Sequence, residues 1–431
     1  MRPKELRKLE SELHEFLGEM FEGLGRRERL ESMCWYVTGL LLDGERKSTE
    51  PMAARLVDDA AEISSMRQRL QECVSISAWS NDVVLSRLAT KIEAELPDVE
   101  ALVIDDTGFP KKGKHSVGVQ RQYSGTLGRQ DNCQVATSLH LAGEQGSACI
   151  ALRLYLPEPW CSDRERRLKA KVPDEIVFLK KWEIALRQLD DALRWGVRRH
   201  VVLADAGYGE VTEFRDGLDD RKLHYVVGIP GEPVVWAPGS EPRIPPKTAR
   251  KGPARTRYFD VEHPPISARD LAAKLAFRKV SWRQGSRGWQ SSRFAAVRIR
   301  TAHRHANGAP PGAEQWLLCQ WPTDENAPTK FWLSNLPANT SIAKLVRLAK
   351  LRWRVERDYQ ELKQEIGLDH FEGRTWRGFH HHAALCAVAH AFLALRRALF
   401  PPEPSEVDDL ACPPGAPTDL AVVDRHLPAM S

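Results

Sequence analysis

Three sets of acidic residues stand where they could bind metal ions together. Asp105 and Asp106 follow the apolar run 101–104, and Asp205 follows the apolar run 201–204. Where two such strands are neighbours in a sheet, the side chains at their carboxyl ends meet. Glu356, in a later basic segment, could complete the cluster from a helix. Like charges a few ångströms apart repel strongly, so this cluster would need cations.

The chemistry of such a cluster is phosphoryl transfer. Ligand sets made only of oxygen favour Mg²⁺ or Mn²⁺. Two such ions about 3.5–4 Å apart can activate a nucleophile and stabilise the leaving oxygen of an in-line displacement. We therefore expect two Mg²⁺ ions, with Mn²⁺ able to substitute. Any one Asp at a strand end could instead be a simple turn or helix cap, so the joint pattern carries the prediction.

Glu356 lies in a basic segment, residues 341–366, that the sequence predicts as one long helix. Arg352, Glu356 and Lys363 would lie at about 0°, 40° and 20° around an ideal helix axis, hence on one face. Residues 344–363 contain seven basic and three acidic side chains. A metal-binding Glu flanked by cations that hold phosphates fits this face. A surface ion pair between Arg352 and Glu356 is the alternative interpretation.

Further basic residues follow the first Asp pair. Lys111, Lys112 and Lys114 stand among Pro110 and Gly113 and could hold phosphates of a nucleic acid near the predicted metal site. A solvated loop is the alternative. The run 380–382 consists of three histidines, but consecutive residues on a helix point in different directions and cannot all bind one ion.

The order of apolar segments predicts the elements that position these residues. Strands are expected at 101–107, 134–141, 149–156, 200–205 and 224–229, with helices at 174–195 and 211–217. The predicted elements follow the order of the ribonuclease H-like fold: three strands, a helix, a strand, a helix and a strand. We therefore predict a mixed α/β class: a ribonuclease H-like catalytic core with a β-rich insertion and an N-terminal helical domain.

The same pattern divides the chain into five predicted segments. Short helices with interspersed Arg and Lys fit a DNA-binding domain or a plain structural bundle, and the proline-rich end fits disorder. The segments are a helical, DNA-binding domain at 1–96, the first part of the core at 97–230, a β-rich insertion at 231–340, the C-terminal core helices at 341–399, and a disordered tail at 400–431.

Composition narrows the class of protein. The 431 residues carry a net charge of +5, which is compatible with a nucleic-acid partner. No apolar run reaches 18 residues, and no apolar stretch follows the basic start, so neither a membrane span nor a secretory signal is expected. The eight cysteines form no Cys-x-x-Cys pair, which indicates reduced thiols in the cytoplasm.

Four motifs together resemble those of the bacterial insertion-sequence DDE transposases, in the cut-and-paste branch with a β-rich insertion. They occur in the family's order over about residues 10–395: Ile104-Asp-Asp-Thr-Gly-Phe-Pro-Lys-Lys-Gly-Lys114, Gln122-Tyr-Ser-Gly-Thr-Leu-Gly128, Leu203-Ala-Asp-Ala-Gly-Tyr-Gly209, and Arg352-Trp-Arg-Val-Glu356 followed by Lys363. The 150 residues between Asp205 and Glu356 leave room for the insertion.

The resemblance implies a metal-binding catalytic triad of Asp105 or Asp106, Asp205 and Glu356. The family's Asp-x-Thr form matches Asp105, whereas Asp106 directly precedes Thr107, and both assignments stay open. The family's Tyr-Arg-Glu-Lys signature maps onto Arg352, Glu356 and Lys363 as DNA contacts around the catalytic Glu. Its Tyr position is Ala349 in this sequence, which is a departure from the family pattern.

The family's activity is Mg²⁺-dependent cleavage of double-stranded DNA at transposon ends, followed by strand transfer of the freed 3′-hydroxyl into target DNA. The resemblance also implies a homodimer on DNA, in the bacterial cytoplasm and at the nucleoid when DNA-bound. Two alternatives remain: a domesticated DNA-binding protein with the same fold, and a DNA endonuclease without strand transfer.

Overall fold

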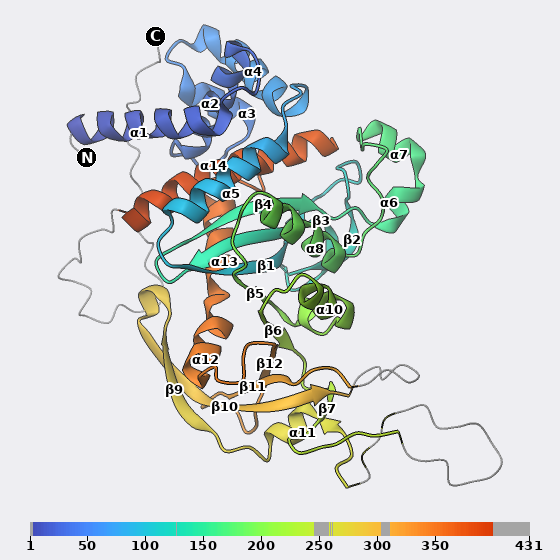
Figure 1. Ribbon diagram of the computed structural model, residues 1–431. Coiled ribbons are helices and arrows are strands. Elements are labelled where there is room, and N and C mark those ends of the chain that lie inside the picture. The colour runs from blue at the N-terminus through green and yellow to red at the C-terminus, as the bar shows by residue number, and fades with distance from the viewer. Residues whose placement is uncertain are drawn as a thin grey trace. The chain divides into compact units, whose positions relative to one another are not determined.

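The computed structural model describes residues 3–125, 127–244, 258, 260, 262–302 and 311–399 (Figure 1). The predicted disordered tail at 400–431 lies outside these residues. The chain forms two compact units. The first contains the residues up to Glu100, Asp105–Arg198 and the chain from Arg354 on; the second contains Ala101–Ile104 and Arg199–Trp353. The boundaries of the five predicted segments stay predictions.

The first unit begins with short helices, as the spacing of apolar residues indicates. Phe16, Leu17 and Met20 lie on one buried stripe of the first helix. Ser80 caps the last of these helices, because its side chain accepts a hydrogen bond from the backbone of Val83. The helices are α1 (Pro3–Phe21), α2 (Arg27–Leu41), α3 (Thr49–Leu56), α4 (Ile63–Ser75) and α5 (Asn81–Glu95), with a short 3₁₀ turn at Ala60–Glu62.

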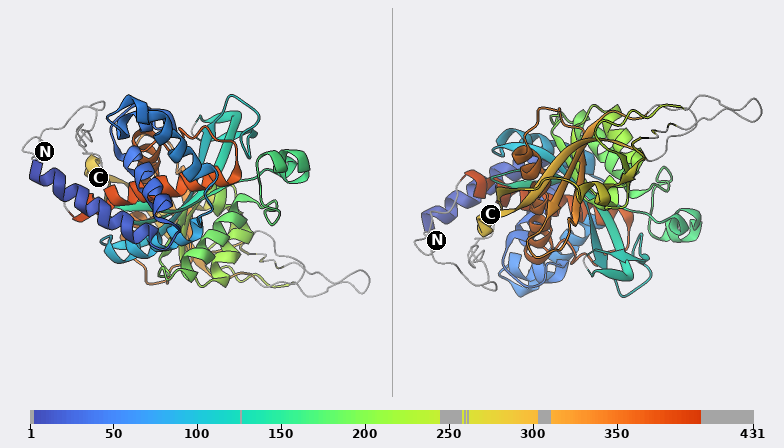
Figure 2. Two further views of the ribbon diagram at one scale, coloured as in Figure 1. Left: turned by 90° about the horizontal axis from the view of Figure 1, so that it is seen from above. Right: turned by 90° about the horizontal axis from the view of Figure 1, so that it is seen from below.

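These helices share their core with the last helix of the chain, α14 (Trp376–Leu399). α14 packs on α2, α4, α5 and strand β4 (Ser147–Leu154), and Figures 1 and 2 show it in red against the blue N-terminal helices. The ring of Phe16 lies 5.4 Å from that of Phe392. By length and composition α14 could cross a membrane, yet 72% of its most apolar window is buried, as in the core helix of a globular protein.

A strand meander forms the middle of the first unit. β1 (Val99–Pro110), β2 (Gln120–Ser124), β3 (Arg129–Gly143) and β4 lie in the order β2-β3-β1, and β4 also pairs with β3. β3 runs antiparallel to both β2 and β4. The short helices α6 (Glu158–Ser162) and α7 (Arg164–Lys169) follow, then α8 (Lys181–Arg194), which packs on β3.

The helix predicted at 174–195 is shorter than expected, since α8 begins only at Lys181. Glu183 accepts a hydrogen bond from the backbone N–H of Lys180 at 2.7 Å, which closes the first turn of the helix at that point. Before it, Phe178 packs edge-on against Tyr155, with ring centroids 6.3 Å apart.

The second unit is built on a mixed sheet. Its strands are β5 (Val201–Ala204), β6 (Tyr225–Ile229), β7 (Val234–Trp236), β8 (Ile266–Ser267), β9 (Arg278–Arg283), β10 (Trp289–Thr301), β11 (Gln315–Trp321) and β12 (Lys330–Ser334). Residues 101–104 of β1 pair in parallel with β5, and β5 with β6. β6 then pairs antiparallel with β12, which continues into β11 and β10. The strands predicted at 231–340 therefore extend the sheet that starts with β5 and β6.

Four helices and one short turn complete the second unit. They are α9 (Ala206–Gly209), α10 (Thr212–Asp220), α11 (Ala268–Ala272), α12 (Ile342–Leu351) and a 3₁₀ turn at Gly285–Arg287. Ser341 caps α12 by accepting from the backbone of Lys344. The described residues of the two units together form a mixed α/β structure, as predicted.

The buried histidines of α14 lead to a first testable prediction. His381 stacks on Trp79, and His382 Nδ1 lies 2.9 Å from the Tyr36 hydroxyl. Burial lowers the pKa of both imidazoles to about 4. Between pH 6.5 and 4 the unfolded chain therefore binds protons that the folded chain does not. The stability that both groups contribute is complete above pH 6.5 and is lost as the pH falls toward 4.

We expect acidification from pH 7.5 to 5 to remove about 2 kcal/mol of unfolding free energy per histidine. Urea titrations at both pH values measure this loss in the wild type and in a His381→Gln/His382→Gln variant. The variant should lose less stability on acidification. The other titrating groups are the same in both proteins, so their contribution cancels when the two losses are subtracted. Equal losses in the two proteins would show that these histidines do not titrate as described.

Candidate active site

Asp105 and Asp106 point to opposite faces of β1, as adjacent strand residues do. Asp106 forms an ion pair with Lys181, the first residue of α8, and accepts a hydrogen bond from Thr137 Oγ1 at 3.3 Å. Asp105 accepts the backbone N–H of Asp106 at 2.8 Å. The Asp106 carboxylate is thus partly neutralised by a cation from α8, a partner that the sequence analysis missed.

The segment that carries Glu356 is not the single regular helix predicted. α12 ends at Leu351, and α13 (Trp353–Gln360) begins after Arg352, which caps α12. Residues Glu361–Glu365 then form a π-helical turn that contains Lys363. The rotation angles of an ideal helix therefore do not hold across this segment, because a π turn is wider than an α turn. Glu356 is exposed, in the first turn of α13.

Helix α13 and the π turn run along the Asp105 face of β1. Lys363 Nζ donates to the carbonyl of Gly108 at 2.9 Å and lies 5.4 Å from the centre of the Phe109 ring. Burial lowers the pKa of Lys363. The hydroxyl of Tyr359, one turn after Glu356, bonds to Ser138 Oγ at 2.5 Å.

Asp105 lies near Tyr359, because Ser138 Oγ contacts both residues, at 3.4 Å from the Asp105 carbonyl and 2.5 Å from the Tyr359 hydroxyl. Burial and, after it, the negative charge of Asp105 raise the pKa of Tyr359 well above its ordinary value. Since residues three apart on a helix share a face, Glu356 and Tyr359 are presented on the same side of α13. The candidate carboxylates Asp105 and Glu356 therefore belong to elements that face each other within the first unit.

Asp205 belongs to the second unit, directly after β5. Its side chain caps α9 by accepting the backbone N–H of Tyr208 at 3.3 Å, so the capping role considered for such an Asp is present. Gly209 must be glycine, because a Cβ there would lie 1.9 Å from the carbonyl of Gly228 on β6. The Gly-rich sequence after Asp205 thus lets α9 pack against the sheet.

The three candidate DNA-binding lysines after β1 have different surroundings. Lys111 is partly buried, and its Nζ donates to the carbonyl of Phe371 at 2.9 Å. Lys112 and Lys114 are exposed. The last two are therefore available to a partner in solution, whereas Lys111 already holds the chain at residue 371.

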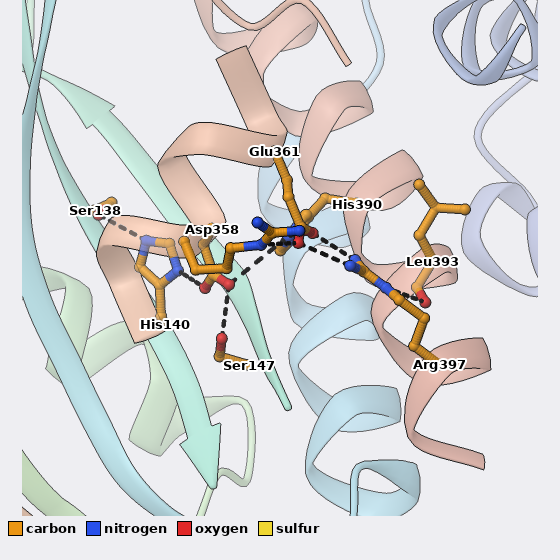
Figure 3. A network of polar contacts seen from close by, with 9 residues as sticks. Ser138, His140, Ser147, Asp358, Glu361, His390, Leu393 and Arg397 are labelled. Atoms are coloured by element: carbon orange, nitrogen blue, oxygen red, sulfur yellow. Dashed lines mark hydrogen bonds and ion pairs between the residues drawn. The ribbon is translucent and has the colours of Figure 1, made fainter. Parts of the chain in front are cut away.

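A buried polar network adjoins α13, and sequence reasoning missed it (Figure 3). His140 and Asp358 join with Nδ1 and Oδ2 2.6 Å apart, and Ser147 donates to the other Asp358 oxygen at 2.6 Å. Burial alone lowers the pKa of His140, but Cys149 and the bond to Asp358 outweigh it and raise the pKa to about 10. The sequence analysis counted Asp358 only as a charge on a basic helix.

The network continues to α14 through Glu361. Arg397 donates to the Glu361 carboxylate from both of its terminal nitrogens, with the Nη1 contact at 2.7 Å. Arg357 Nε donates to the same carboxylate at 2.7 Å. Burial raises the pKa of Glu361, but Arg397 and His390 outweigh it, and the pKa lies well below its ordinary value. The π turn is therefore anchored by a charge pair with α14.

The donors suit a hard divalent cation in their chemistry, since all candidates are carboxylates. Among the residues that the structure describes, no group of three or more His, Cys, Asp or Glu side chains is arranged to hold a metal ion. The candidate set is divided between the units, with Asp105, Asp106 and Glu356 in the first and Asp205 in the second.

Comparison with known proteins agrees with the resemblance seen in the motifs. A family model described as "DDE superfamily endonuclease" matches residues 19–289, which is more than half of the chain. The chain is also 29% identical over 201 residues to "Probable transposase for insertion sequence element IS701" from Microchaete diplosiphon. That match covers 46% of this chain and 48% of the relative, so it spans about half of each.

Proposed function

The chain belongs to the DDE superfamily endonucleases, and from this premise we propose that it is an insertion-sequence transposase. It would cleave double-stranded DNA at transposon ends and join the freed 3′-hydroxyl to target DNA. The observation that carries the proposal is the arrangement within the first unit. The helix with Glu356 runs along the Asp105 face of β1, with Tyr359 joined to the Asp105 carbonyl through Ser138 Oγ and Lys363 bonded to Gly108.

Asp105, Asp205 and Glu356 are the proposed Mg²⁺ ligands. When bound, two Mg²⁺ ions would stabilise the charge that develops on the oxygens of the scissile phosphate, and Mn²⁺ could replace them. Support for Asp205 comes from the strand register. Val103 pairs with Leu203 in the parallel strands β1 and β5, and a carboxylate stands two residues further along the chain in each case: Asp105 within β1 and Asp205 directly after β5.

We propose Asp105 rather than Asp106 as the ligand from β1. Asp106 faces α8 and is paired with Lys181, so a metal ion would have to displace a cation already bound. Asp105 faces the helix of Glu356. This choice leaves Asp106 a structural role, in which it ties β1 to the start of α8.

Basic residues around this site would hold the DNA. Lys112 and Lys114 are exposed and can neutralise phosphates. Arg352 and Lys363 are further proposed phosphate contacts, on either side of Glu356 in the sequence. Lys363 also fixes β1 through Gly108, so it would position the strand as well as the substrate.

The finer structural and cellular assignments rest on the same premise. The order β1, β3, β4, α8, β5, α10, β6 supports a ribonuclease H-like core, with β7–β12 as the β-rich insertion at 231–340. We further propose that α1–α5 contribute to DNA binding. We also propose that the protein acts as a homodimer on DNA, in the bacterial cytoplasm and at the nucleoid.

A labelled-end assay tests the function. The protein is incubated with Mg²⁺, a labelled duplex that carries the candidate element end, and unlabelled target DNA. We expect cut and joined products, and neither product from Glu356→Gln, which removes one charged ligand oxygen but preserves the size of the side chain. Binding of the labelled end should persist in the variant, because phosphate contacts supply most of the affinity.

The same assay separates the alternatives. Cut but unjoined DNA would identify an endonuclease without strand transfer. Bound but uncut DNA would identify a domesticated DNA-binding protein with the same fold. Cleavage by Glu356→Gln at the wild-type rate would remove Glu356 from the site.

A further inference from the structure

A buried set of hydroxyl and imidazole groups lies between the strand of Asp105 and the helix of Glu356. Ser138, on β3, is fully buried and touches both elements. Its Oγ donates to the carbonyl of Asp105 at 3.4 Å and lies 2.5 Å from the Tyr359 hydroxyl. A single hydroxyl thus links the backbone of one candidate ligand to the helix of the other.

One assignment of protons satisfies all of these hydrogen bonds. Ser138 has one hydroxyl proton, which goes to the Asp105 carbonyl. Tyr359 must then donate to Ser138 Oγ. Ser138 Oγ also lies 2.9 Å from His140 Nε2, and a protonated imidazole would donate to it there. The serine oxygen would then be saturated, which fixes its rotamer and with it the position of the Tyr359 hydroxyl.

Asp358 holds the other end of this arrangement. It follows Glu356 by two residues on α13, and its carboxylate binds both His140 on β3 and Ser147 on β4. The ring of His140 also meets that of Tyr359 edge-on, with centroids 5.6 Å apart. Two consecutive helix residues, 358 and 359, therefore form hydrogen bonds with the same strand, β3. As a result α13 can neither rotate nor slide without breaking buried hydrogen bonds.

We infer that Tyr359, Ser138, His140 and Asp358 are positioning residues that set the placement of the Glu356 helix against the Asp105 strand. The inference rests on the proposed function, since it concerns how the proposed ligands are aligned. Misplacement by about 1 Å costs on the order of 10²-fold in rate. Buried polar contacts fix such a distance more sharply than apolar packing, because hydrogen bonds are directional.

The decisive variant is Tyr359→Phe, which removes one hydroxyl and keeps the ring. We expect single-turnover cleavage to slow by about 10- to 100-fold, with the Kd for end DNA within about twofold and the melting temperature nearly unchanged. Tyr36→Phe is the matched control, because it also removes a buried Tyr–His hydrogen bond in the same unit. That control should cleave like the wild type.

Two further measurements separate positioning from general stability. Ser138→Ala should slow cleavage at least as much as Tyr359→Phe, because it removes the bond to Tyr359 and also the bond to the Asp105 carbonyl, and the double variant should be no slower than Ser138→Ala alone. Amide exchange of residues 353–360 in the metal-free protein should be faster in Tyr359→Phe and unchanged in Tyr36→Phe. This second readout does not depend on cleavage.

Each outcome decides the inference. Wild-type cleavage by Tyr359→Phe, or a slower rate matched by an equal loss of stability or DNA affinity, overturns it. A wild-type protein that never cleaves contradicts the proposed function instead. In that case unchanged exchange at 353–360 still overturns the positioning role, and faster exchange supports it.

Discussion

Asp105→Asn should reduce DNA cleavage by about 10³-fold, whereas Asp106→Asn should reduce it by less than about tenfold. The first change removes a charged ligand oxygen from the face that meets the Glu356 helix. A loss of several kcal/mol of transition-state stabilisation corresponds to this factor. The second change removes an ion pair with Lys181, in which the two side chains are 23% and 47% exposed and which is therefore weak. Initial cleavage rates on a labelled end measure both.

Lys181→Met is the matched control for this comparison, because it breaks the Asp106 ion pair without touching either carboxylate. It should behave like Asp106→Asn. If Asp106→Asn does not cleave DNA while Asp105→Asn does, the assignment of the ligand is reversed. Binding of the uncut end, measured in parallel, should stay within a few-fold in all three variants.

Removal of residues 1–96 should abolish cooperative unfolding of the remaining chain. Those residues contain α1–α5, four of which pack directly on α14. The deletion would uncover the buried rings of Phe392, His381 and His382, which contact Phe16, Trp79 and Tyr36. Such exposed apolar surface removes the driving force for folding. Calorimetry and near-UV circular dichroism should show no sharp transition.

Phe16→Ala provides a graded control for the deletion. It truncates a single ring that packs on Phe392, so it should cost about 3–5 kcal/mol of unfolding free energy while the chain still folds. If the deleted protein instead melts sharply near the wild-type temperature, residues 97–399 fold alone. The predicted boundary at 96 would then mark an independent domain.

Local patterns in the sequence were sufficient to predict the family and most of the helices and strands. The apolar runs before Asp105 and Asp205 predict two strands, and these strands are β1 and β5; Asp205 directly follows β5 as predicted, whereas β1 continues past Asp105 to Pro110. Such runs are readable because strand formation and the alternation of side chains depend on near neighbours. The order of the motifs indicated a DDE enzyme, and the family model assigns the chain to the DDE superfamily endonucleases.

Contacts between distant residues decided features that no local pattern reveals. Alternation implies that Asp105 and Asp106 point to opposite faces, but only the packing of α8 and α13 shows which face meets Glu356. The predicted single helix is divided at Arg352 and widened at Glu361–Glu365. The contact of Arg397 with Glu361 there spans 36 residues.

The positioning residues show most clearly the difference between what local sequence patterns predict and what tertiary contacts decide. His140 and Asp358 are 218 residues apart in the sequence, and Ser138 and Tyr359 are 221 apart. A serine, a histidine and a tyrosine at such separations carry no periodic signal, because hydrogen-bond partners are chosen by the fold rather than by spacing along the chain. The sequence determined which carboxylates could do chemistry. The tertiary structure decided what holds them, since buried polar groups must find partners wherever the packed chain brings them.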